Sequence, residues 1–192
     1  MLEEERTYSK KDIKRVLITE KQIQYRIRKL AEQISRDYAS VRRMLMVPIY
    51  KGAGTFFSDL NREIDHSIPR VQDFTVLSSY DGRTVSSGNV KTILDLKMDI
   101  EGEDVLVVED ILDTGRTLSA LVDHLSRRHP KSLKLCVLLD KPARRASGLE
   151  QFKADYTGFT IEDHFVVGYG LDIHEYLRNL PYVGILKPEV PK

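Results

Sequence analysis

The chain has 192 residues, 41% hydrophobic and 31% charged, which predicts one compact domain and argues against disorder. Lys and Arg number 30 against 29 Asp and Glu, so the net charge of +1 lacks the basic signature of nucleic-acid or membrane-surface proteins. The single cysteine, Cys136, excludes a disulfide scaffold, and its apolar neighbours indicate a buried, inert thiol. With a polar N-terminus and no apolar run near the ~18 residues of a membrane span, we expect a cytoplasmic protein with no membrane and no nucleic-acid partner.

The first third of the chain predicts a helix, a buried strand and a second helix. Residues 19–39 carry apolar residues on one face, and Thr19 with Gln22 has the spacing of a capping box. Residues 44–50 are apolar and end at a Lys-Gly pair, as a buried strand does on entering a turn. A short helix is expected over residues 55–62.

The middle of the chain predicts two strands, over residues 74–78 and 90–96, on either side of a polar stretch. That stretch, residues 78–89, is rich in Ser, Gly and Asp. Loops of this length in compact domains are often functional lids. We therefore expect a long exposed loop that is either a functional lid or disordered.

The most apolar strand is predicted over residues 104–108, and helical periodicity resumes shortly after it, from Leu118. Residues 133–139 and 165–168 predict further strands. Apolar strands that alternate with helices indicate a mostly parallel sheet covered on both faces. We predict an α/β, doubly wound fold in a single domain, 1–192, with a small flanking hood formed by residues 1–18 and 170–192.

The segment between that strand and the helix carries the chemistry, because ligands of open parallel sheets bind beyond the carboxyl ends of the strands. Glu109, Asp110 and Asp113 supply carboxylates, which suit hydroxyl groups or a divalent cation. Residues 114–117 open the helix, and helix-start amides with a Gly favour a phosphate. The pattern describes a site for a phosphorylated sugar, with a plain helix cap as the structural alternative.

The complete run over residues 105–117 resembles the phosphoribosyl pyrophosphate (PRPP) signature of the type I phosphoribosyltransferases. Further motifs resemble that family in the same order along the chain. The similarity is greatest to the bacterial hypoxanthine (hypoxanthine-guanine) phosphoribosyltransferases, and it spans about residues 15–190. The matching motifs are Tyr50-Lys51-Gly52, Ser79-Tyr80, Lys141-Pro142 with Arg144-Arg145, and residues 165–172 with Arg178 and Pro181-Tyr182.

The resemblance implies a binding site for PRPP along the signature. Glu109 and Asp110 would contact the ribose hydroxyls, and Asp113 would act as general base near N7 of the purine. Pyrophosphate would bind at Lys51, Gly52 and Arg178, where the family often has a non-proline cis peptide. The 5-phosphate would bind along the loop of Asp113, Thr114, Gly115, Arg116 and Thr117.

The resemblance also implies the purine site and the metal. Lys141 would donate to the 6-oxo group, Phe165 would stack on the purine, and Val166 would contact the base through its main chain. Asp172 is assigned to the purine and metal segment. Mg²⁺ would be the cofactor, with Glu109, Asp110 and Asp172 as its candidate ligands. The matching mobile-loop pair is Ser79 and Tyr80.

The implied activity is purine salvage: a 6-oxopurine (hypoxanthine, guanine or both) and PRPP give the nucleoside 5'-monophosphate and pyrophosphate. By resemblance, we expect a homodimer or homotetramer. Two alternatives stay open: a xanthine-preferring enzyme, and a PRPP-sensing regulator that binds nucleic acid. The sequence departs from the family pattern at Tyr50, Asp81 and His164, and His164 leaves the choice between guanine and hypoxanthine undecided.

Overall fold

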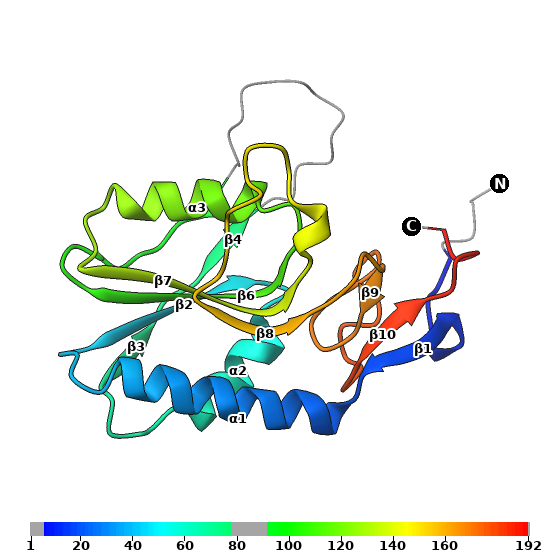
Figure 1. The fold of residues 1–192 in the computed structure, drawn as a ribbon, viewed down its shortest axis with the longest axis horizontal. Helices are drawn as coiled ribbons and strands as arrows, with labels where there is room; N and C mark the ends of the chain where they lie inside the picture. Colours follow the sequence, from blue (N-terminus) through cyan, green and yellow to red (C-terminus); the bar gives the residue numbers. More distant parts are fainter. Residues whose placement is uncertain (1–5, 78–91, 192) are drawn as a thin grey trace.

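The computed structural model describes residues 6–77 and 92–191 (Figure 1). Its main sheet has seven strands, in the order β5-β4-β2-β6-β7-β8, with β3 also paired to β2. Neighbouring strands are parallel except β4 and β5. The strands are β2 (Met44–Tyr50), β3 (Arg70–Gln72), β4 (Thr75–Leu77), β5 (Thr92–Leu94), β6 (Asp104–Leu112), β7 (Ser132–Asp140) and β8 (Tyr156–Thr160).

Helices cover both faces of this sheet. Helices α1 (Glu20–Asp37) and α2 (Gly54–Glu63) lie on one face and α3 (Arg116–Ser126) on the other (Figure 1). Along β6, Leu106 and Val108 pack with the α1 and α2 side, whereas Val105 and Val107 pack with the α3 side. Both faces of the strand are buried, which explains its unbroken apolar run. The predicted doubly wound, mostly parallel fold is confirmed.

Helix α1 begins as the sequence predicts. The amide of Gln22 donates to Thr19 Oγ1 at 3.4 Å, and the amide of Thr19 donates to Gln22 Oε1 at 2.8 Å. This capping box satisfies two amides that the start of a helix otherwise leaves without partners. The N-terminus of α1 is therefore closed by its own side chains.

A second, three-stranded antiparallel sheet forms the hood, in the order β1-β10-β9. It joins β1 (Ile13–Ile18), β9 (Val166–Val167) and β10 (Val183–Leu186), and a short turn of 3-10 helix (Lys10–Asp12) precedes it. The prediction of a hood built from the two ends of the chain is confirmed. The hood begins earlier than residue 170, because β9, which lies within the strand expected over residues 165–168, pairs with β10.

The sixth strand along the main sheet is β8, which the sequence analysis missed. Its residues, Tyr156–Thr160, alternate between buried and partly buried positions at the sheet edge, so they form no apolar run. Gly158 lies tightly against β7, since a Cβ there would be 2.4 Å from the carbonyl oxygen of Leu138. A further short 3-10 turn, Pro142–Arg144, follows β7.

Three other expectations concern the whole chain. The predicted loop of residues 78–89, with Ser79, Tyr80 and Asp81, lies outside the described residues. Cys136 is buried in the core, as predicted, and burial raises the pKa of its thiol. No helix in the described ranges is both long enough and apolar enough to cross a bilayer.

Candidate functional site

The strand register gathers the predicted motifs at one edge of the main sheet. Pro48 of β2 lies opposite Val108 of β6, so the Lys51-Gly52 turn meets the acids at the end of β6. Leu112 of β6 pairs with Asp140 of β7. The next residue on each strand is a predicted site residue, so parallel pairing places both sets at the carboxyl edge.

Strand β6 is longer than predicted, and two of the acids belong to it. The apolar run predicts a strand that ends at Val108, whereas β6 continues to Leu112 and includes Glu109 and Asp110. Burial and the neighbouring Asp110 raise the pKa of Glu109 well above its usual value, and burial also raises the pKa of Asp110. Oxygen Oε2 of Glu109 is buried and has no hydrogen-bond partner among the described residues.

The Lys51-Gly52 turn lies directly against Asp110. The peptide bond between Tyr50 and Lys51 is cis, at the motif where the resemblance implied one. A Cβ on Gly52 would lie 1.9 Å from Asp110 Oδ2, and a Cβ on Gly170 would lie 2.1 Å from the Gly52 carbonyl oxygen. Gly170 also has a φ of 103°, which favours glycine. A side chain at position 52 or 170 would therefore clash, and only glycine fits at either position.

The start of α3 is left open, unlike that of α1. Gly115, the residue before the helix, has a φ of 81° and no side chain that could cap the first turn. The hydroxyl of Thr114 accepts from the amide of Arg116, at 3.4 Å. First-turn amides without an intrahelical partner, together with the helix dipole, favour a bound phosphate. The predicted 5-phosphate loop therefore has suitable local geometry.

Asp113 and Lys141 stand side by side at the ends of β6 and β7. Lys141 is buried, and its side chain keeps only 7% of its exposure. Arg144 contacts Asp113, with 3.2 Å between Nε and Oδ1. Asp163, which the sequence analysis missed, lies 3.9 Å from Lys141 Nζ and 3.7 Å from Arg144 Nε.

Arg145 holds these two strand ends together. Its side chain is 4% exposed and forms an ion pair with Asp140. The family motif contains both Arg144 and Arg145, and the sequence does not indicate which of the two is buried. The side chain donates to the carbonyls of Leu112 at 3.0 Å, Asp113 at 2.6 Å, Lys141 at 3.1 Å and Phe152 at 3.1 Å.

Phe165 and Val166 enter the site from the hood side. Phe165 is 37% exposed, so part of its aromatic ring is accessible for stacking. Val166 is buried in β9 and pairs with Ile185. Next to them, His164 approaches Glu162, with 3.3 Å between Nε2 and Oε2.

Asp172 and Arg178 lie near the acids of β6. Arg178 Nη2 is 2.8 Å from Asp172 Oδ1, and Nη1 donates to the Gly170 carbonyl at 2.7 Å. Both side chains act on the charge of Asp110: Arg178 lowers its pKa and Asp172 raises it, although burial has the larger effect. Lys51 joins the same region through Glu175, at 3.0 Å.

Glu109, Asp110 and Asp172 are the carboxylates that could supply oxygen ligands to a divalent cation, together with ligands from outside the protein. Asp110 and Asp172 interact electrostatically, and Glu109 keeps one buried carboxylate oxygen unpartnered among the described residues. Within residues 6–77 and 92–191, no group of three or more His, Cys, Asp or Glu converges as a complete metal site. Mg²⁺ accepts such partial protein coordination, since it usually keeps waters and phosphate oxygens.

Comparisons with known proteins agree on one family. The model of the phosphoribosyl transferase domain matches residues 17–174. The hypoxanthine-guanine phosphoribosyltransferase of Bacillus subtilis is 46% identical over 94% of this chain and 97% of its own length. The crystal structure of a hypoxanthine phosphoribosyltransferase from Staphylococcus aureus has a TM-score of 0.87 and 46% identity, and the match covers 95% of this chain and 96% of that one.

A longer relative is also similar. The bifunctional protein TilS/HprT of Listeria innocua is 51% identical over 93% of this chain. The chain spans 27% of the length of that relative.

Proposed function

The chain belongs to the phosphoribosyltransferase family, and on that premise we propose that it joins hypoxanthine, guanine or both to the ribose phosphate of PRPP in purine salvage. The observation that carries this proposal is the pairing of Leu112 with Asp140. It brings a carboxylate, Asp113, and a buried ammonium, Lys141, to the same edge of the sheet. These groups suit two atoms of a 6-oxopurine: a nitrogen that loses a proton and an oxygen that accepts a hydrogen bond.

The reaction exchanges one bond at the anomeric carbon of the ribose. A purine nitrogen forms the new bond to that carbon, the bond to the pyrophosphate oxygen breaks, and its electron pair leaves with pyrophosphate. Asp113 takes the proton that the purine loses and, as an anion, opposes the positive charge that develops on the ribose. Phe165 supports the base by stacking.

The phosphate and ribose are bound by the neighbouring segments. The open start of α3 binds the 5-phosphate, and Glu109 and Asp110 accept hydrogen bonds from the ribose hydroxyls. Mg²⁺, held by one or two of Glu109, Asp110 and Asp172 together with substrate oxygens, would neutralise charge on the leaving pyrophosphate. Lys51 and Arg178 bind that pyrophosphate from the other side.

Lys141 sets the choice of base. An ammonium donates and cannot accept, so it favours the 6-oxo group of hypoxanthine or guanine over the 6-amino group of adenine. Xanthine also has a 6-oxo group, so this contact does not separate it from the other two. The difference must come from contacts to the rest of the base, and His164, next to Phe165 in the chain, is the candidate.

The decisive experiment is a steady-state assay with PRPP and Mg²⁺ against hypoxanthine, guanine, xanthine and adenine in parallel. We expect turnover of hypoxanthine or guanine and none of adenine. Turnover of xanthine alone would move the assignment to the xanthine-preferring alternative. PRPP binding without turnover of any base would overturn the enzymatic proposal and favour a regulator.

We also propose a homodimer or homotetramer. Tyr50 and Phe74 are exposed large apolar residues whose rings pack edge to face, with 5.6 Å between centroids, near the end of β2. Such residues are common at subunit interfaces. Light scattering of the purified chain tests the proposal, and a monomer at micromolar concentration would overturn it.

A further inference from the structure

Glu175 lies between the two cations assigned to pyrophosphate. Its Oε2 is 3.0 Å from Lys51 Nζ and 3.4 Å from Arg178 Nη2. A single carboxylate oxygen thus faces both cations, as an oxygen of bound pyrophosphate would. The hydrogen bond from Lys51 lowers the pKa of Glu175, so the side chain is an anion at neutral pH.

The backbone directs Glu175 toward these cations. Its φ is 70°, in the left-handed region that side chains other than glycine rarely adopt. Its amide donates to Asp172 Oδ2 at 2.8 Å. Ile173 and Tyr176 close the turn with reciprocal backbone hydrogen bonds, at 3.2 and 2.9 Å. The position of Glu175 is therefore built into the turn that also presents Asp172.

Arg178 retains a donor that Glu175 does not use. Its Nη1 and Nη2 have partners, whereas Nε is buried and has no hydrogen-bond partner in the described part of the chain. Buried donors normally have a partner, so an unpartnered one points to a missing acceptor. An oxyanion with more oxygens than one carboxylate could use this donor and replace Glu175 at the same time.

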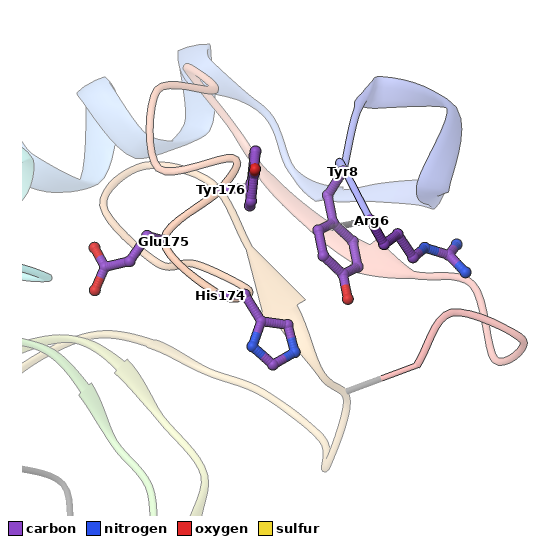
Figure 2. Close-up of a pocket in the computed structure, with 5 residues that line it drawn as sticks. All are labelled: Arg6, Tyr8, His174, Glu175 and Tyr176. Carbon is purple, nitrogen blue, oxygen red and sulfur yellow. The ribbon is translucent and has the colours of Figure 1, made fainter. Parts of the chain in front are cut away.

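Glu175 also has room to leave. Its side chain is 61% exposed and lines a cavity of about 600 Å³ in the hood. The other lining residues are Arg6, Tyr8, His174 and Tyr176, and the Glu175 carboxylate points away from the Tyr8 ring (Figure 2). Tyr8 packs near His174 and Tyr176, with ring centroids 5.7 and 5.6 Å apart.

We propose that Glu175 is an internal competitor for the pyrophosphate site: it pairs with Lys51 and Arg178 in the ligand-free protein and is displaced when pyrophosphate or PRPP binds. The inference rests on the proposed function, which assigns pyrophosphate to these two cations. Because displacement costs the energy of the internal pairs, Glu175 weakens binding of both ligands. It also favours release of the product, since the carboxylate returns as pyrophosphate leaves.

The test compares Glu175→Gln with Glu32→Gln. Glutamine keeps the shape of the side chain but loses its charge. Glu32 is a matched control, since it forms an exposed ion pair with Lys29 at 2.8 Å on α1. With Mg²⁺ present, calorimetry should show that E175Q binds pyrophosphate about twofold to tenfold more tightly than wild type, because each exposed pair contributes only weakly. The KM for PRPP should fall in proportion, with the KM for hypoxanthine unchanged.

Equal or weaker pyrophosphate binding by E175Q would overturn the inference, since weaker binding would mean that Glu175 orients the cations for the ligand. Glu175→Ala serves as a second variant, and its affinity should change in the same direction. E32Q should match wild type in both measurements. Wild-type turnover separates the two failures: if wild type is inactive with every base, the proposed function fails and this inference falls with it, whereas active wild type with unchanged E175Q affinity refutes the role of Glu175 alone.

Discussion

The proposed purine side and the proposed pyrophosphate side of the site are built differently. On the purine side, Lys141 and Arg145 are buried, with side chains 7% and 4% exposed. On the pyrophosphate side, Lys51 and Glu175 are 66% and 61% exposed and pair with each other. Arg178 on the same side is anchored to the Gly170 carbonyl and to Asp172, so the exposed pair of Lys51 and Glu175 is what distinguishes this side.

This difference suits the two tasks. The Arg145 donors bind backbone carbonyls, which cannot move away, so Asp113 and Lys141, which we propose to contact the base, are held in place in advance. Exposed ion pairs contribute about 0.2–1 kcal/mol each and exchange partners at little cost. A site that must select a base benefits from fixed groups, whereas one that must release a charged product benefits from exchangeable ones.

The largest effect is expected at the centre of the purine side. Asp113→Asn removes the base but keeps the side-chain shape, so kcat should fall by about 10²–10⁴-fold while PRPP still binds. Steady-state kinetics measure kcat, and calorimetry measures the binding of PRPP. Asp123→Asn, at an exposed position on α3, is the control. Unchanged turnover in D113N would remove Asp113 from this role.

The comparison of neighbouring arginines comes next. Arg145→Ala leaves Asp140 without its buried partner and removes one donor from each of four backbone carbonyls, so the free energy of unfolding should fall by about 3–5 kcal/mol. Arg144→Ala removes a side chain that is 48% exposed and should cost under about 1 kcal/mol. Urea unfolding measures the free energy of unfolding of both variants. Similar decreases in the two variants would contradict the expected difference between Arg145 and Arg144.

An intermediate effect on selectivity is expected at Lys141. Replacing it with Ala should lower kcat/KM for hypoxanthine by about tenfold or more, because a hydrogen bond from a charged donor is lost, and the preference over adenine should narrow. The KM for PRPP should change much less. Parallel assays with hypoxanthine and adenine show whether the constants for the base change more than the KM for PRPP. If base and PRPP constants change equally, Lys141 does not contact the base.

The smallest effect is expected on the exposed side. Lys51→Ala should raise the KM for PRPP by up to about fivefold, because an exposed pair with a charged ligand is weak and screened. The difference between variant and wild type should shrink as NaCl rises. Kinetics at low and high salt measure it, and a change of 100-fold would show that Lys51 becomes buried when the ligand binds.

Much of the site is contained in one short run of sequence. Residues 105–117 include a strand, its acids and the start of a helix, so local physics predicts their proximity: neighbours in sequence stay neighbours in space. The capping box of Thr19 and Gln22 is likewise predictable, because its two residues are close in the sequence. The end of β6 was predicted too early, because charged residues at the end of a strand resemble the beginning of a loop.

Other features depend on contacts between distant segments. The sequence alone determined the fold class, the apolar cores of the strands and the candidate acids, because these follow from periodicity and local chemistry. Only the tertiary structure decided that β9 joins the hood, that Arg145 is buried while Arg144 is exposed, and that Glu175 faces Lys51. Adjacent residues of the same type differ only in which distant atoms surround them, and strand register and packing, not local sequence, determine those surroundings.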